Sequence, residues 1–139
     1  GEGVPGPIER TLGIVGSRSA LLILREAFLG TRRFDDFVRR IGIAPATASA
    51  HLRSLVAAGL LRRDPYREPG SRPRQEYRLT DSGLDFLPVI SALFRWGQEH
   101  VGAHSGLELS HEGCGAEVFP ELRCAAGHPV PVSAVLGVA

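Results

Sequence analysis

The spacing of apolar residues along the chain predicts a mainly helical protein. From Ser17, which can cap a helix, to about Leu29, apolar residues lie on nearly every side, as in a helix at the centre of a domain. Over residues 34–41 the apolar residues recur at intervals of three and four, which predicts a second, shorter helix that ends at a glycine. A further short helix is predicted from Pro7 to Val15.

A helix-turn-helix is predicted where this second helix leads into the next one. Residues 42–44 form a short turn that begins with Gly42, and Pro45 suits the first position of a helix that extends to Ala58. The residues of this helix that face inward are Ala48, Leu52, Leu55 and Val56. Its outward residues are small or polar, which lets a helix sit deep in the DNA major groove; they are Ala46, Thr47, Ser49, Ala50 and Arg53.

Two strands are predicted next, over residues 60–67 and 75–79, on either side of a loop rich in proline and glycine. The hairpin region from Arg62 to Arg78 carries six arginines and three acidic residues. A basic hairpin directly after a recognition helix is typical of a β-wing, whose arginines bind DNA phosphates or enter the minor groove. The predicted wing contacts are Arg67, Arg72 and Arg74, with Arg33 and Arg62 as weaker phosphate contacts.

A long helix is predicted from Asp81 to about His104, with Thr80 as its cap and a bend at Pro88. Its broad apolar face has little of the small domain left to pack against, so we expect a partner subunit to cover it in a homodimer. The alternative is that this helix packs back on the helix of Leu21, and both arrangements can hold together. The predicted dimerisation residues are Leu84, Leu87, Ile90, Leu93, Phe94, Trp96 and Val101.

Composition and charge narrow the class of protein. All 16 basic residues are arginine, so mechanisms that need lysine, such as a Schiff base or a Walker A site, are excluded. No apolar run approaches the roughly 20 residues of a membrane-spanning helix. With no secretory signal visible either, the sequence predicts a cytoplasmic protein without a membrane partner. Residues 1–78 carry 14 arginines and eight acids, whereas residues 79–139 carry two arginines and seven acids, so a polyanionic partner is expected for the first half.

The tail, residues 105–139, holds two pairs of residues that can bind a metal: His111 with Cys114, and Cys124 with His128. Two cysteines and two histidines can bind zinc tetrahedrally. The cysteines can instead form a disulfide within or between subunits, although cytoplasmic reduction argues against a permanent one. The third interpretation is two thiols in a structural flap. The spacing leaves all three open, and no metal or cofactor is assigned.

The order and spacing of several stretches resemble the HxlR-type winged-helix transcription regulators, relatives of the MarR group. The likeness extends from about Pro7 to Val101. It implies a homodimeric DNA-binding regulator whose first and last helices form the dimer contact. The stretches that carry it are residues 12–16 and 21–26, 33–37 and 41–43, 52–55 and 58–61, 76–80 with Gly83, 87–88, and 96–97.

The chain departs from this family at positions that bear on mechanism. Gly6 stands where many members have a cysteine that senses oxidants or electrophiles, so that mechanism does not carry over. Ser19 stands where tryptophan is common. Ala44 and Ala46 replace a polar cap and a lysine at the start of the recognition helix, and a lost cap costs about 1 kcal/mol. DNA binding with altered specificity is therefore expected.

We accordingly predict a mainly α, winged helix-turn-helix protein with a small β-wing, dimerising through its terminal helices. Residues 1–104 form the DNA-binding domain with its dimerisation helix, and residues 105–139 form a C-terminal extension. The predicted function is a transcription regulator, expected to repress by binding a pseudo-palindromic site on double-stranded DNA, with an unknown small-molecule effector. The rival prediction is a winged-helix protein-interaction module that does not bind DNA; no motif predicts an enzyme. The predicted DNA contacts are Pro45, Ala46, Thr47, Ser49, Ala50, Arg53, Arg67, Arg72 and Arg74.

Overall fold

The computed structural model describes residues 3–66, 68–72 and 74–137. It divides into two compact units, Gly1–Leu87 and Pro88–Ala139. The boundary between these units falls just before Pro88, whereas the sequence predicted a functional division after residue 104. That functional division stays a prediction.

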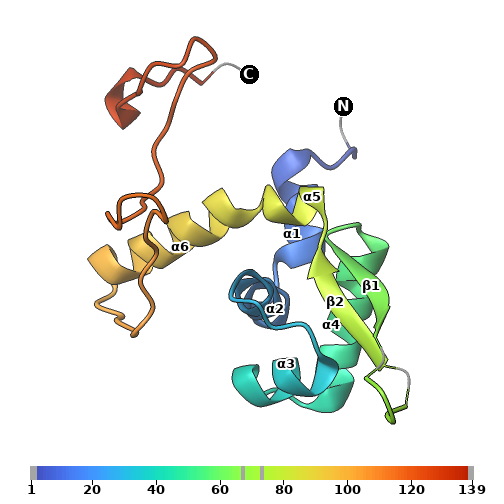
Figure 1. Cartoon of the computed structure of the whole chain (residues 1–139). Coiled ribbons are helices and arrows are strands. Elements are labelled where there is room, and N and C mark those ends of the chain that lie inside the picture. The colour runs from blue at the N-terminus through green and yellow to red at the C-terminus, as the bar shows by residue number, and fades with distance from the viewer. Residues whose placement is uncertain (1–2, 67, 73, 138–139) are drawn as a thin grey trace. The chain divides into compact units, whose positions relative to one another are not determined.

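Apart from α5, the elements of the first unit are the helices and the hairpin that the apolar pattern predicted, with ends that differ by a residue or two (Figure 1). The Ser17 side chain caps the second helix as expected, by accepting a hydrogen bond from the Ala20 backbone N–H at 3.1 Å. The elements are α1 (Pro7–Val15), α2 (Arg18–Phe28), α3 (Phe34–Ile41), α4 (Pro45–Ala57), β1 (Leu61–Tyr66), β2 (Arg74–Leu79) and α5 (Asp81–Leu84).

The core of this unit forms where α2 meets α3 and α4. Ile23 and Leu24 of α2 are fully buried, in agreement with the prediction of a central helix. Phe37 of α3 is fully buried as well, and its ring meets that of Tyr77 edge-on, with centroids 6.3 Å apart. Leu61 at the start of β1 is also buried, so the hairpin is anchored to the same core as the helices. The buried residues of α4 are Ala48, Leu52 and Leu55.

The turn between α3 and α4 has the backbone that a helix-turn-helix requires. Gly42 ends α3 in the left-handed conformation, with φ of 75°, which glycine adopts without the steric penalty of a side chain. Pro45 then occupies the first turn of α4. Ala44, the N-cap residue, makes no side-chain capping bond, as the sequence predicted.

The hairpin is a two-stranded antiparallel sheet in which Leu61 pairs with Leu79 and Tyr66 pairs with Arg74. The free edge of β2 meets the segment just before α3. There, Arg33 forms a β-bridge with Glu76, and the Tyr77 backbone N–H donates to the Arg32 carbonyl at 2.7 Å. The wing and the helix-turn-helix are therefore joined by main-chain hydrogen bonds as well as by the core.

The prediction of one bent helix from Asp81 to His104 is wrong, because the chain forms two helices here. The first, α5, ends at Leu84, and the second, α6 (Leu87–His100), begins one residue before Pro88. Proline has no N–H to continue the helical ladder, and its ring would clash with the carbonyl of Leu84 four residues earlier. In the first turn of a new helix the missing N–H costs nothing, so the proline starts α6 instead of bending a longer helix.

Thr80 is the cap that starts α5, and its removal gives a test of the local fold. Its hydroxyl oxygen accepts a hydrogen bond from the Gly83 N–H at 3.1 Å, and the hydroxyl donates to the Gly59 carbonyl. Replacing Thr80 with alanine is expected to lower the free energy of unfolding by about 1 kcal/mol in urea denaturation. Thr80→Ser keeps the hydroxyl and should lose much less, so equal losses in the two variants would contradict a capping role.

The second unit consists of α6 from Pro88 onward and the tail. Two isolated bridges close short turns in the tail, one between Ser110 and Glu117 and the other between Arg123 and Pro129. A single 3-10 turn follows over Val132–Ala134. Among the described residues, no helix has the length and apolar character needed to cross a membrane.

Candidate nucleic-acid interface

The outward face of α4 is open and carries little bulk. Pro45, Ala46, Ala50 and Arg53 are exposed, and Thr47 and Ser49 are half-buried. None of these residues belongs to the core, which takes the opposite side of the helix. The period of 3.6 residues correctly placed Ala48, Leu52 and Leu55 in the core, whereas Val56, also predicted to face inward, is only half-buried. None of the predicted base-reading residues is fully buried.

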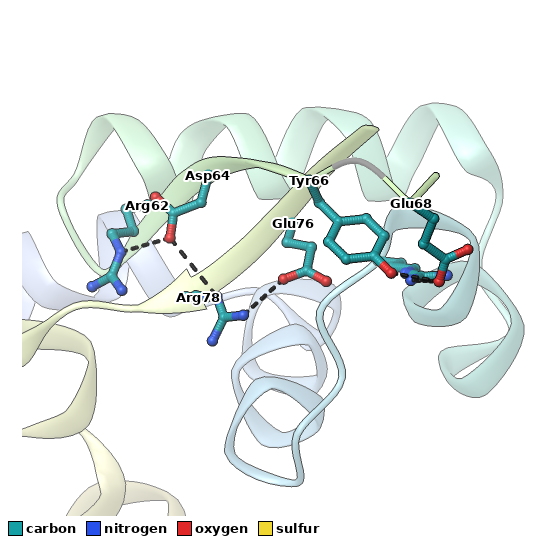
Figure 2. A network of polar contacts seen from close by, with 7 residues as sticks. Arg62, Asp64, Tyr66, Glu68, Glu76 and Arg78 are labelled. Carbon is teal, nitrogen blue, oxygen red and sulfur yellow. Dashed lines mark hydrogen bonds and ion pairs between the residues drawn. The ribbon is translucent and has the colours of Figure 1, made fainter. Parts of the chain in front are cut away.

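Acidic residues of the hairpin pair with two of the arginines near its base. Arg62 Nε lies 2.9 Å from Asp64 Oδ2, and Arg78 Nη2 lies 2.9 Å from Glu76 Oε2 (Figure 2). Arg78 also approaches Asp64, at 3.8 Å. Arg62, predicted as a weaker phosphate contact, thus already has an anionic partner within the protein.

The third acidic residue of the hairpin, Glu68, is bound by two donors. Its Oε1 atom accepts hydrogen bonds from Arg33 Nη2, at 3.2 Å, and from the Tyr66 hydroxyl. Figure 2 shows Tyr66 directed toward Glu68. The Arg33 guanidinium also lies over the Tyr66 ring, 4.4 Å from its centroid. The hydrogen bonds from Tyr66 and then Arg33 hold the pKa of the Glu68 carboxyl below its usual value, and the bond to Glu68 raises the pKa of the Tyr66 phenol.

We call these three residues, Arg33, Tyr66 and Glu68, the Arg33 cluster. Sequence reasoning named Arg33 as a phosphate contact and missed both of its partners. Glu68 lies 35 residues from Arg33 in sequence, so no local spacing connects them. Only the bridge between the Arg33 segment and β2 brings them together.

The tip of the wing remains the basic end of the hairpin. Arg72 and Arg74 are both exposed, and the three acidic residues of the hairpin bind arginines at other positions. Arg67, also predicted as a wing contact, lies outside the described residues. The exposed positive charge near the tip is where the sequence placed it.

Apolar side chains are exposed along α1, at the end of α5, and along and just after α6. Leu93 and Trp96 are 52% and 59% exposed, and Leu84, Leu87 and Val101 are exposed as well. Ile90 and Phe94, from the same predicted set, are half-buried. In α1, the residue-level prediction missed Ile8, Leu12 and Ile14, although Ile8 and Leu12, which are four residues apart and share one helix face, could have been found by their spacing.

The tail keeps its two thiols free and exposed. The Cys114 sulfur lies 3.2 Å from His111 Nδ1, and the Cys124 sulfur accepts the His128 backbone N–H at 3.4 Å, so each predicted pair is local to one turn. Several backbone hydrogen bonds lower the pKa of the Cys124 thiol, and the one from the His128 N–H has the largest effect. Within the described part of the chain, no three His, Cys, Asp or Glu side chains are grouped so that they could hold a metal ion.

An exposed recognition helix, a preceding helix joined by a glycine turn, and a basic hairpin define a winged helix-turn-helix protein of the kind that binds DNA. Residues 14–105 match the model of the family described as HxlR-like helix-turn-helix. The chain belongs to this family, as the motifs in its sequence indicated.

Relatives and solved structures agree with this assignment. An uncharacterized HTH-type transcriptional regulator of Mycobacterium tuberculosis is 45% identical over 120 residues, which cover 84% of this chain and 74% of the relative. The crystal structure of PA1607, a candidate transcription factor, is similar with a TM-score of 0.83 and 31% identity, covering 99% of this chain and 96% of that one. The structure of PA1374, a candidate transcription factor from Pseudomonas aeruginosa, is similar with a TM-score of 0.66 and 36% identity. The match covers 96% of this chain and 92% of PA1374. The protein is thus a helix-turn-helix transcriptional regulator and not an enzyme, and the similarity to PA1607 includes the tail.

Proposed function

We propose that the chain acts as a homodimer on a pseudo-palindromic operator in double-stranded DNA, with repression as its mode of action. The observation that carries this proposal is the exposed, small-residue face of α4, with the exposed arginines of the wing tip in the same unit. A protein-interaction module would have no need of such a basic tip. Because a transcription regulator must reach DNA, we place the protein in the cytoplasm.

In this proposal α4 enters the major groove. Thr47, Ser49, Ala50 and Arg53 are the base-reading residues, and Pro45 and Ala46 lie at the groove entrance. Alanine and serine allow a close approach of the helix to the base edges. Arginine suits guanine, because its guanidinium can donate to two acceptors of that base at once. Arg53 is therefore the residue that we expect to discriminate most between sequences.

The wing arginines Arg67, Arg72 and Arg74 contact the backbone or enter the minor groove. Phosphate contacts supply affinity that depends on salt but not on sequence. Arginine is preferred to lysine where phosphates are bound in a bidentate manner or where a narrow groove is entered. A wing whose basic residues are all arginine suits both uses.

The dimer would bury the apolar residues of α6, with α1 contributing as the family resemblance implies. Leu93 and Trp96, which lie three residues apart on α6, are both exposed. A contiguous exposed apolar patch is unusual on a monomer and typical of an interface. A twofold dimer would present two α4 helices to half-sites about 34 Å apart, or a multiple of that distance.

A small-molecule effector is proposed to bind within the second unit. A cavity of about 350 Å³ lies between α6 and the first part of the tail, and its lining includes Ser91, Phe94, Arg95, Leu107 and Leu109. The lining combines the apolar side chains with the carboxylates of Glu108 and Glu117, and Glu117 lies 3.7 Å from Arg95, so the cavity suits a small amphipathic ligand. A compound bound there is expected to raise the melting temperature of the chain and to change its affinity for the operator.

Two variants separate sequence reading from backbone binding. Arg53→Ala is expected to relax discrimination between operator and unrelated duplex, because it removes a base contact worth about 1–3 kcal/mol. Arg72→Ala combined with Arg74→Ala should weaken binding to all sequences alike and reduce the salt dependence by roughly two phosphate contacts per subunit. Fluorescence anisotropy with both duplexes at several salt concentrations measures each effect. Equal losses of discrimination in the two variants would contradict these roles.

A further inference from the structure

The Arg33 cluster lies between the two parts of the proposed DNA-binding surface, the helix-turn-helix and the wing. We propose that Arg33, Tyr66 and Glu68 are positioning residues that hold the wing in its DNA-binding orientation, so that Arg33 acts through the wing and is not itself a phosphate contact. This inference rests on the proposed DNA-binding function and assigns a role to residues that the interface did not otherwise use.

Each member of the cluster comes from a different point of the fold. Arg33 is the N-cap residue of α3, Tyr66 is the last residue of β1, and Glu68 belongs to the loop that follows. One carboxylate oxygen of Glu68 accepts from both Arg33 and Tyr66, and the Arg33 guanidinium lies over the tyrosine ring. Three mutual contacts thus fix the end of β1, the first strand of the hairpin, to the start of α3.

The second strand of the hairpin, β2, is held by the same short segment before α3, residues 32–33. Arg33 forms a backbone bridge with Glu76 of β2, and the Tyr77 N–H donates to the Arg32 carbonyl. Both strands are therefore attached to residues 32–33, β1 through side chains and β2 through the main chain. Two attachments resist the rotation of a hairpin about its base, whereas one would permit it.

Glu68 also connects the cluster to the tip of the wing. Its backbone carbonyl accepts the Ser71 N–H at 3.0 Å, which closes the turn immediately before Arg72. A chain of contacts then leads from α3 through Arg33, Glu68 and Ser71 to the first exposed tip arginine. Moving the Glu68 side chain would move this turn, and with it the guanidinium that is proposed to meet the DNA backbone.

The cluster is poorly suited to a role in stability alone. The side chains of Arg33 and Glu68 are 36% and 54% exposed, and exposed ion pairs add little to the free energy of folding. Its geometry is nevertheless specific, because the guanidinium is held by a carboxylate and by an aromatic face together. Placing the wing before DNA arrives spares the complex the entropy of ordering it afterwards.

The opposite interpretation is that Glu68 merely repels phosphates and keeps Arg33 from binding them. The two interpretations predict opposite signs for Glu68→Gln. Loss of a repelling charge should tighten DNA binding, whereas loss of a positioning contact should weaken it. Asp35→Asn is the matched control, since Asp35 is an exposed acid of the first turn of α3 and its replacement removes the same charge.

A double-mutant cycle tests the inference with a labelled mixed-sequence duplex, because wing contacts are proposed not to depend on sequence. Glu68→Gln is expected to weaken binding by about threefold to tenfold, and Tyr66→Phe to weaken it less, whereas Asp35→Asn should not weaken it. The loss of DNA affinity caused by Arg72→Ala combined with Arg74→Ala should be at least about threefold smaller in the Glu68→Gln background than in the wild-type chain. Tighter binding by Glu68→Gln, or an undiminished loss at the wing tip, would overturn the inference.

A second readout keeps the inference separate from the proposed function. If the wild-type chain binds no duplex at any salt concentration, the proposed function fails, and the positioning role is still measurable by hydrogen exchange. Glu68→Gln and Tyr66→Phe should both speed exchange of the Ser71 amide, while Asp35→Asn should leave it unchanged. An unchanged Ser71 amide in both cluster variants would show that the cluster does not hold the wing.

Discussion

Replacing Ala50 with glutamate is expected to abolish DNA binding without unfolding the protein. Ala50 is exposed on α4, so a longer side chain meets no core atoms in the free protein. In the proposed complex the new carboxylate would enter the major groove between two phosphate backbones, and it can also pair with Arg53, three residues further along the same helix face. We expect the affinity to fall by about 100-fold or more, the combined effect of repulsion by the phosphates and the loss of Arg53 as a base contact.

The matched control is Ala50→Gln, which has nearly the same size and no charge. Fluorescence anisotropy should show a much smaller loss for glutamine than for glutamate, and circular dichroism should show the same helical content for both. If glutamate at this position leaves the affinity for duplex DNA unchanged, α4 is not the helix that enters the groove.

Leu93→Glu is expected to convert the dimer into monomers. Leu93 is 52% exposed in the middle of α6, and a carboxylate there would be buried without a partner in the proposed interface. Sedimentation velocity should show a species of half the mass. Affinity for a two-half-site operator should fall by about 100-fold or more, because each half-site is then bound independently.

Leu29→Glu makes the same change at a leucine of equal exposure, 51%, which follows α2 and belongs to neither terminal helix. That variant should remain dimeric. A wild-type chain that sediments as a monomer at micromolar concentration, or a Leu93 variant that stays dimeric, would contradict dimerisation through α6.

Most of the first unit could be predicted from the sequence, because its signals are local. The inward positions of α4 follow from the helical period, and Ser17, Gly42 and Thr80 mark helix ends by their own side chains or backbone preferences. The break before α6 was misjudged for the opposite reason. Strong apolar periodicity on both sides of Pro88 suggested one helix, but a proline ring excludes the carbonyl that continuity would need.

The candidate site divides in the same way. The accessible face of α4 and the basic wing tip depend on spacing and charge along the chain, so the sequence was sufficient to predict that Ala50, Arg53, Arg72 and Arg74 are exposed, while their contacts with DNA stay predictions. The Arg33 cluster depends on contacts between segments that are remote in sequence, and a guanidinium with a partner cannot be told from a free one by composition. Arg33 and Arg62 therefore looked like phosphate contacts, while the structure pairs both with carboxylates.

The most direct test of the account is a titration of the wild-type protein against a labelled duplex from the region upstream of its own gene, since regulators of this kind often lie beside their targets. We predict saturable binding that survives an excess of unrelated duplex and weakens with salt along a straight line in the logarithms of affinity and salt concentration. Binding that is absent at low salt, or that unrelated duplex removes in direct proportion to its concentration, would contradict a sequence-specific winged-helix regulator.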